Sequence, residues 1–269
     1  MQLPPQYELL SACRPTAPFR TALFDFDGTL SLLREGWPAV MIDLMVEELK
    51  NTPRAETTEA LNAFVELFIM RLNGQPTLVQ MARLADEVRQ RGGHPLEAET
   101  YKSEYLQRLM QVVKPRRQAL TSGVAVPDEW TVAGARLFLA QLRLQGVHLV
   151  LASGTDLEDV RKELDLLELT DFFGAEIHGA TPDGSFSKPQ LIARLLSAGH
   201  GPLIGFGDGI VETAEVKRVG GFAIGVASDF AMPGRINPWK RPQLVSAGAD
   251  FLIPDFTEAH WLAAFVSGG

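Results

Sequence analysis

Short apolar runs that end in Gly, Ser or Asp recur along this 269-residue chain, and they limit its fold more than any other feature. Between the later runs, apolar residues recur at the spacing of one helix face, as at Val132, Ala135, Leu139 and Leu142. Strands that alternate with helices of this length form a parallel sheet, and ligands bind such sheets at the carboxyl ends of the strands. The sequence therefore predicts an α/β fold, with strands at 23–26, 147–152, 203–206, 222–226 and 251–253 and core helices at 131–145, 157–167, 188–198 and 211–219.

One of these runs delivers two carboxylates, Asp25 and Asp27, in the segment TALFDFDGTL at residues 21–30. On a strand, a spacing of two places both side chains on the same side. Two carboxylates held close together repel each other, so the pair favours a cation between them or a proton on one of them. Mg²⁺ takes oxygen ligands and leaves positions open for water and a substrate phosphate. The alternative for this segment alone is an exposed Asp-x-Asp-Gly turn after a buried strand.

A different pattern lies between Leu30 and about Leu120, where helical stretches follow one another without a strand. We interpret residues 31–120 as a helical cap, inserted into a core formed by residues 1–30 and 121–269. Two linkers join the cap to the core, and a cap on two linkers is able to close over the end of the first strand as a lid. The predicted cap helices are 38–51, 56–72, 77–91 and 95–113.

Three later positions have side chains that suit a phosphate site. Ser153 follows a strand, where a hydroxyl and the N–H groups of the next helix can hold an oxyanion; the alternative is that Ser153 or Thr155 is a helix N-cap. Lys188 opens a helix, although a lone lysine is more often a solvated surface charge. Asp208 lies between glycines after an apolar strand, with Glu212 four residues later. It either completes a cation site or belongs to a plain Gly-Asp-Gly turn.

The charge and cysteine content of the chain narrow the class of partner. With a formal net charge of -8 and a pI of about 5.2, the chain has no general polyanion-binding character, so we expect no nucleic acid partner. Cys13 is the single cysteine, which excludes an internal disulfide and fits a reducing compartment. Residues 1–20 do not have the pattern of a signal peptide, and no apolar run is long enough to span a bilayer. We therefore expect a cytoplasmic protein without a membrane partner.

In their order and spacing, these segments resemble the haloacid dehalogenase (HAD) superfamily, whose members are mostly Mg²⁺-dependent phosphatases. The resemblance covers about residues 20–30 and 120–256. The run from Asp25 to Leu30 matches the first motif of the family, and Ser153, Lys188 and Asp208 match the second, third and fourth. The helical block matches the cap that phosphoglycolate phosphatase-like and β-phosphoglucomutase-like members carry after the first motif. The resemblance implies a Rossmann-like parallel sheet core with an inserted all-helical cap.

The resemblance also implies a role for each motif residue. Asp25 is expected to be the nucleophile and Asp27 the general acid/base, and Mg²⁺ is expected to be held by the Asp25 carboxylate, the Asp27 backbone carbonyl and Asp208. Many members have a second aspartate where this chain has Glu212, which we expect to reach the metal through water, or to be an acid that only stabilises the start of its helix. The expected phosphate-binding residues are Gly28, Thr29, Ser153, Gly154 and Lys188.

The expected activity is Mg²⁺-dependent hydrolysis of a small phosphorylated metabolite, a phosphate monoester, through an aspartyl-phosphate. Dehalogenases and phosphonate hydrolases of the family lack an acid at the position of Asp27, so its presence favours a phosphatase. Two alternatives stay open. A sugar phosphomutase uses the same residues but returns the phosphoryl group to a sugar, and a non-catalytic binding protein retains the fold without turnover.

Substrate selection is expected where the cap linker and a cap loop face the site. The candidates for specificity, which are otherwise structural, are Arg34, Glu35, Trp37, Gln75 and Thr77.

A Pro-rich stretch at residues 232–242 contains Arg235, Lys240 and Arg241. It either flanks the active site and adds positive charge or forms a solvated loop.

Overall fold

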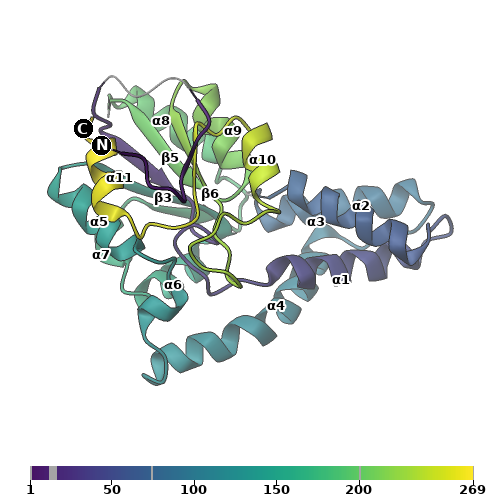
Figure 1. Cartoon of the computed structure of the whole chain (residues 1–269). Coiled ribbons are helices and arrows are strands. Elements are labelled where there is room, and N and C mark those ends of the chain that lie inside the picture. Colours follow the sequence, from purple (N-terminus) through teal and green to yellow (C-terminus); the bar gives the residue numbers. More distant parts are fainter. Residues whose placement is uncertain (1, 12–16, 74, 200, 269) are drawn as a thin grey trace.

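The computed structural model describes residues 2–11, 17–73, 75–199 and 201–268, and its core is built on one sheet (Figure 1). Within those residues, seven strands form the sheet in the order β1-β7-β6-β5-β2-β3-β4. Neighbouring strands are parallel except β1, which pairs antiparallel with β7. The predicted α/β fold is confirmed, and Cys13 lies outside the described residues. The strands are β1 (Glu8–Leu9), β2 (Thr21–Phe24), β3 (His148–Asp156), β4 (Ile177–Ala180), β5 (Leu203–Gly207), β6 (Phe222–Val226) and β7 (Phe251–Ile253).

The strands are apolar on both faces because helices cover both sides of the sheet. Successive strand residues point to opposite faces, so Ala22 and Phe24 of β2 belong to one apolar cluster and Leu23 to another. The larger cluster includes side chains from α5 (Ala135–Leu144), α6 (Leu157–Leu166), α7 (Thr170–Phe173) and α11 (Ala259–Val266). On the other face lie α8 (Lys188–Ser197), α9 (Ile210–Arg218) and α10 (Arg241–Ser246).

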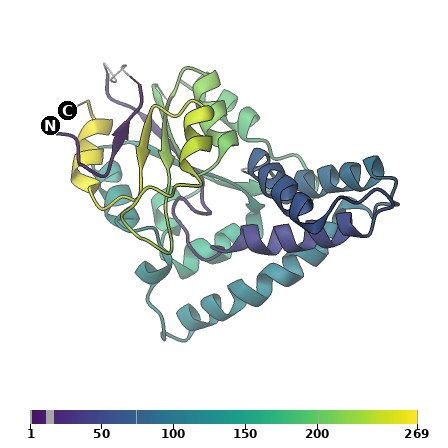
Figure 2. The ribbon, with the colours of Figure 1, turned by 45° about the vertical axis from the view of Figure 1, so that its right-hand side comes forward.

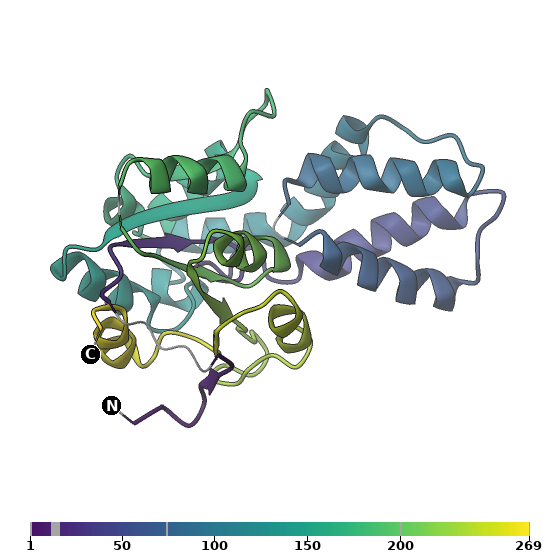
Figure 3. The same cartoon turned by 90° about the horizontal axis from the view of Figure 1, so that it is seen from above.

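Four consecutive helices lie to one side of the sheet, beyond the carboxyl ends of its central strands (Figure 2, Figure 3). They have an apolar cluster of their own, which includes Leu44, Val65, Leu84 and Tyr101, one residue from each helix. The division of the chain into a cap at residues 31–120 and a core stays a prediction. The last of the four helices ends one residue beyond residue 120. None of the helices in the described segments combines the length and the apolar character needed to cross a membrane. The four helices are α1 (Trp37–Lys50), α2 (Thr58–Arg71), α3 (Thr77–Gln90) and α4 (Ala98–Thr121).

The two linkers to these helices are bonded to each other through Arg116. Arg116 of α4 donates from Nη1 to the carbonyl oxygens of Leu33, at 2.9 Å, and of Glu35, at 2.7 Å. On the cap side of these contacts lie Gly36, which has a φ of 95°, and Pro115, which lies inside α4. The two linkers therefore form one structure rather than two separate strands of chain.

Several elements differ from the sequence prediction at the edges of the sheet. The prediction did not include β1, β4, α7, α10 or α11, which are short or lie beside edge strands. Strand β3 continues four residues past its predicted end, because it pairs with β4 across a register shift between Ala152 and Asp156. Helix α4 starts three residues later and ends eight residues later than predicted, since Pro115 is accommodated inside it.

Candidate active site

The carboxyl edge of the sheet gathers the motif residues because β5, β2 and β3 are neighbours. Phe24 of β2 is level with Leu151 of β3 and with Phe206 of β5 in the parallel register. Polar residues come one or two positions after each of these levels. They are Asp25, Ser153 and Asp208.

Asp25 is buried and forms an ion pair with a buried lysine. Lys188, the first residue of α8, places Nζ 2.7 Å from Asp25 Oδ1 and 3.2 Å from Glu212 Oε2. Burial raises the pKa of Asp25 well above its ordinary value; the Lys188 ammonium opposes this effect, and the carboxylates of Glu212 and Asp208 add to it. Although burial alone lowers the pKa of Lys188, the carboxylates of Asp25 and Glu212 raise it, so the ammonium keeps its charge.

Glu212 uses both of its carboxylate oxygens inside the protein. Oε2 binds Lys188, and Oε1 accepts a hydrogen bond of 3.0 Å from the backbone N–H of Gly209, at the start of α9. A Cβ on Gly207 would lie 2.2 Å from Glu212 Cγ, so the glycine there leaves room for the glutamate. These contacts give Glu212 two structural tasks beside any effect on a metal, namely holding Lys188 and closing the turn that carries Asp208.

Asp27 has the setting of a proton-transfer group. Its Oδ2 accepts a hydrogen bond of 2.7 Å from Thr155 Oγ1, while Oδ1 has no hydrogen-bond partner and lies 3.7 Å from Arg34 Nε. Burial raises the pKa of Asp27 to about 6; Arg34 opposes the rise, and Glu163 and then Asp208 add to it. A carboxyl group with this pKa can give and take a proton near neutral pH.

Arg34 lies beside Asp27, but its guanidinium is bound by other carboxylates. Its Nη2 lies 2.9 Å from Glu163 Oε1 and 3.2 Å from Asp159 Oδ2, both on α6. Glu163 is fully buried and also accepts a hydrogen bond from Arg117 of α4. Arg34 therefore lines the site with its charge already balanced.

In the described part of the chain, one group of three acidic residues can hold a metal ion: Asp25, Asp208 and Glu212. Each offers an oxygen, and these oxygens lie within 4.8 Å of one another. Carboxylate oxygens are ligands that Mg²⁺ prefers, and a divalent cation would counter the charge repulsion that raises the pKa of Asp25. The residues fit the predicted Mg²⁺, and the Asp27 carbonyl as a further ligand stays a prediction.

The expected phosphate-binding residues fall into three groups. Ser153 and Gly154 line the site cavity, but Ser153 Oγ accepts a hydrogen bond of 3.1 Å from the Thr155 N–H. Gly28 and Thr29 do not line it, and their N–H groups donate within the loop, to the carbonyls of Ser31 and Phe26. Lys188 lies behind Asp25, in a smaller cavity that Asp25 also lines.

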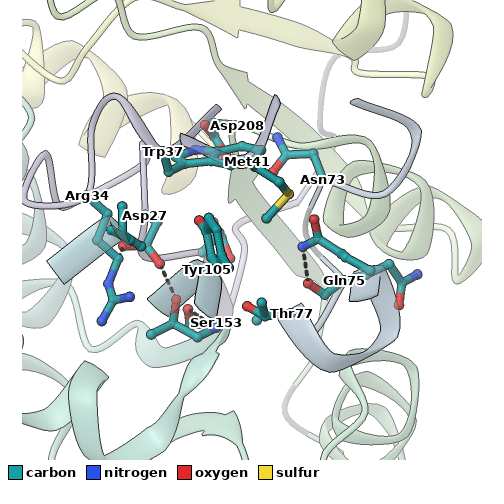
Figure 4. Close-up of a pocket in the computed structure, with 15 residues that line it drawn as sticks. Asp27, Arg34, Trp37, Met41, Asn73, Gln75, Thr77, Tyr105, Ser153 and Asp208 are labelled. Carbon is teal, nitrogen blue, oxygen red and sulfur yellow. Dashed lines mark hydrogen bonds and ion pairs between the residues drawn. The ribbon is translucent and has the colours of Figure 1, made fainter. Parts of the chain in front are cut away.

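A cavity of about 70 Å³ lies between the sheet edge and the helices α1, α3 and α4 (Figure 4). We call its two sides the core wall and the cap wall. The core wall is formed by Asp25, Asp27, Arg34, Ser153, Gly154, Thr155 and Asp208. The cap wall is formed by Trp37, Met41, Gln80, Tyr105 and Leu109, with Asn73 and Gln75 from the loop before α3 and Thr77 at the first position of α3.

Of the five specificity candidates, Arg34, Trp37, Gln75 and Thr77 line this cavity and Glu35 does not. Gly74, in the same loop, lies outside the described residues. Sequence reasoning missed the cap-wall residues inside helices: Met41, Gln80, Tyr105 and Leu109.

The amide of Gln80 is a polar group of the cap wall whose hydrogen bonding is incomplete. Its Nε2 donates to the carbonyl of Gln75 at 3.0 Å, which fixes the orientation of the amide. Its Oε1 is buried and has no hydrogen-bond partner. A buried acceptor without a partner carries a free-energy cost that a ligand donor can relieve.

The three basic residues of the stretch 232–242 differ in burial and in their partners. Arg235 is exposed, and Arg241 is exposed and pairs with Glu8. Lys240 is buried, and its Nζ lies 2.9 Å from Asp208 Oδ2, so a solvated loop is the wrong description of this residue.

Comparison with known proteins identifies the class to which this fold and site belong. The family model of haloacid dehalogenase-like hydrolases matches residues 19–220, and the chain therefore belongs to this family. The resemblance inferred from the sequence motifs is confirmed. No match was found among the curated proteins.

Solved structures of HAD proteins share the fold over most of their length. A β-phosphoglucomutase from Clostridium difficile is 13% identical with a TM-score of 0.59, over 92% of this chain and 97% of that one. A HAD family hydrolase from Deinococcus radiodurans, solved with bound phosphate and sodium, is 20% identical with a TM-score of 0.54, over 94% and 100%. A hydrolase from Pseudomonas syringae is 18% identical with a TM-score of 0.56, over 92% and 99%. At these identities the likeness shows the fold alone.

Proposed function

We propose that this protein is a Mg²⁺-dependent phosphatase that hydrolyses a small-molecule phosphate monoester through an aspartyl-phosphate. The observation that carries the proposal is the arrangement of two carboxylates at the end of β2. Asp25 is buried against Lys188, while Asp27, with a pKa of about 6, lines the same cavity and keeps one oxygen without a hydrogen-bond partner. One carboxylate is placed to attack and the other to transfer a proton.

In the first step, an oxygen of the Asp25 carboxylate attacks phosphorus and forms a bond to it. The bond between phosphorus and the ester oxygen breaks, and Asp27 gives its proton to that leaving oxygen. Water then attacks the aspartyl-phosphate while Asp27 takes its proton, which releases phosphate and restores the Asp25 carboxylate. Lys188 and the Ser153 hydroxyl balance the charge of the phosphoryl oxygens.

The metal would be held by Asp25 and Asp208, with Glu212 in the same carboxylate group. When bound, Mg²⁺ supplies positive charge that reduces the repulsion between the Asp25 carboxylate and the phosphate. The remaining residues around it hold and orient: Glu212 fixes Lys188, and Thr155 fixes Asp27.

The cavity favours a substrate whose leaving group is small, uncharged and hydroxylated. Among the described residues that line it, Arg34 is the one with a positively charged side chain, and Asp159 and Glu163 bind that charge. A carboxylate or a second phosphate on the leaving group would therefore lack a partner. The unpartnered Oε1 of Gln80 instead suits a hydroxyl donor.

A sugar phosphomutase is the second candidate, because the same two carboxylates can return a phosphoryl group to a sugar. The two reactions differ in whether water reaches the aspartyl-phosphate. Measuring phosphate release against isomer formation from hexose phosphates separates them.

The test of the proposal is a screen of phosphorylated metabolites for phosphate release with Mg²⁺, with Asp25→Asn protein as the blank. We expect turnover of at least one uncharged hydroxylated ester and none by the blank. Absence of turnover of every ester, with and without isomer formation, would leave a non-catalytic binding protein as the better description. The cytoplasmic location stays a prediction.

A further inference from the structure

A second buried lysine lies at the proposed metal site, outside the four motifs that this chain shares with its family. Lys240 is 7% exposed, and its Nζ lies 2.9 Å from Asp208 Oδ2. The same Nζ donates to Ser228 Oγ at 3.0 Å. The two nearest polar partners of this ammonium are thus a carboxylate of the metal group and a serine of the core.

The position of Lys240 is fixed by the core. The N–H of Asn237 donates to the carbonyl of Ala227 at 2.8 Å, which ties the loop to the end of β6. Asn237 Oδ1 accepts from the backbone N–H groups of Trp239, at 2.8 Å, and Lys240, at 3.1 Å.

Ser228 also connects Lys240 to the first motif. Ser228 Oγ donates to the carbonyl of Gly28 at 2.6 Å, so the ammonium lies between the turns that follow β2 and β5. A Cβ on Gly28 would lie 2.1 Å from Asp208 Oδ2 and 3.1 Å from Lys240 Nζ. The glycine is needed for the close approach of these two side chains to the first motif.

The contact has a consequence for how Asp208 can bind a metal. A carboxylate has two oxygens, and Lys240 engages Oδ2 of Asp208. Mg²⁺ binds carboxylates through single oxygens in a strict octahedral shell, whereas Ca²⁺ accepts more ligands and takes carboxylates through both oxygens. A carboxylate with one oxygen occupied suits the smaller ion.

We propose that Lys240 is a positioning residue that leaves Asp208 one oxygen for the metal and thereby favours Mg²⁺ over Ca²⁺. The proposal rests on the metal site of the proposed function. It differs from a simple charge effect, because a nearby positive charge weakens the binding of two divalent ions alike, whereas occupation of one oxygen changes their ratio.

The test is calorimetric titration of the whole, ligand-free protein with Mg²⁺ alone and with Ca²⁺ alone. Lys240→Met removes the ammonium and keeps much of the side-chain volume. The matched control is Lys217→Met, which removes another lysine paired with an aspartate, Asp250 at 2.7 Å, away from the cavity. We expect the ratio of the Ca²⁺ to the Mg²⁺ dissociation constant to fall about tenfold in Lys240→Met, the lower end of the effect of residues that orient metal ligands, and to stay unchanged in the control.

An unchanged ratio would overturn the proposal, whether both dissociation constants change by the same factor, which would leave a charge effect, or neither of them changes. If Lys240→Met does not fold, Ser228→Ala removes the second partner of the ammonium and should shift the ratio in the same direction by a smaller factor. An unchanged ratio in that variant would then overturn the proposal. Wild-type protein that binds neither ion would overturn the metal site itself, and with it the Mg²⁺ part of the proposed function.

Discussion

The core wall and the cap wall of the cavity are built from different chemistry. On the core wall, charged side chains are matched by partners of opposite charge or by hydrogen bonds, as for Asp25 with Lys188 and Asp208 with Lys240. The core-wall oxygen without a hydrogen-bond partner, Asp27 Oδ1, belongs to the proposed proton-transfer group. The cap wall carries amides, a phenol and apolar side chains, and the Gln80 acceptor on it has no hydrogen-bond partner. The core wall is therefore organised before a substrate arrives, whereas the cap wall is completed by one.

This difference separates two kinds of variant. A change to Asp25 or Asp208 on the core wall should affect turnover of every ester, because these groups act on the phosphoryl unit or hold the metal. Asp27 is the exception on this wall, since its proton goes to the leaving oxygen. A change on the cap wall should affect some esters and spare others, because it alters contacts with the leaving group.

The largest effect is expected from Asp25→Asn, which removes the attacking oxygen and keeps the shape of the side chain. Turnover of all esters should fall by at least about 1,000-fold, as for other nucleophiles. The measurement is phosphate release, with the exposed Asp183→Asn as the control. Activity within tenfold of wild type, in protein free of other phosphatases, would rule out the covalent mechanism.

The second prediction compares Asp208→Ala with Glu212→Gln. Loss of a direct ligand should nearly abolish activity at any Mg²⁺ concentration. Glutamine at position 212 can still accept from the Gly209 N–H, so Glu212→Gln should mainly raise the Mg²⁺ concentration needed, by about 10–100-fold. A Mg²⁺ titration of activity measures both. A titration of Glu212→Gln that matches wild type would limit this residue to its structural hydrogen bonds.

The third prediction concerns Asp27→Asn, which should slow the step in which the leaving oxygen receives a proton. Alkyl esters, whose leaving oxygen needs a proton, should lose about 100- to 10,000-fold in rate, and p-nitrophenyl phosphate much less. Because the pKa of Asp27 is about 6, its proton is present below that pH and is lost above it. Wild-type turnover of alkyl esters should therefore fall as pH rises through about 6, and Asp27→Asn should lack that decline. Equal losses for both ester types would contradict the role in protonating the leaving oxygen and would leave Asp27 only the activation of water.

The smallest effect is expected from Gln80→Leu on the cap wall. The variant loses an acceptor worth about 1 kcal/mol to a hydroxylated leaving group, so KM for such an ester should rise about fivefold. The KM for p-nitrophenyl phosphate should not change. Gln90→Leu, an exposed glutamine at the end of the same helix, is the control. A uniform change for both esters would mean that the two walls do not act separately.

The core wall was the more predictable of the two because its residues follow strands. The apolar runs placed β2, β3 and β5, and parallel pairing then brought Asp25, Ser153 and Asp208 to one edge. The cap wall depends on how helices pack against that edge, which no local pattern reports. Gln80 had a local signal as a polar residue one helical turn before Leu84, on the buried face of α3.

Lys240 shows a different limit of sequence reasoning. Its partner Asp208 is far away in the sequence, and the Pro-rich stretch around it is equally typical of a surface loop. Lys240 is held by Asn237 and Ser228. Asn237 is bonded to Ala227 at the end of β6, and Ser228 is bonded to Gly28 in the turn after β2. The position of the Lys240 ammonium therefore depends on the turns after β2 and β5 and on the stretch after β6 together.

The bonds of Arg116 to the carbonyls of Leu33 and Glu35 have a mechanical consequence. Because the two linkers are bonded to each other, we expect the helices α1–α4 to move together about one axis rather than about each linker separately. The first points outside the joined region where the backbone can bend are Gly36, with its φ of 95°, and Pro115, which lacks the N–H of a regular helix residue. We expect rotation about that axis to carry Trp37 and Tyr105 away from the cavity and to leave Arg34 and Asp27 in place.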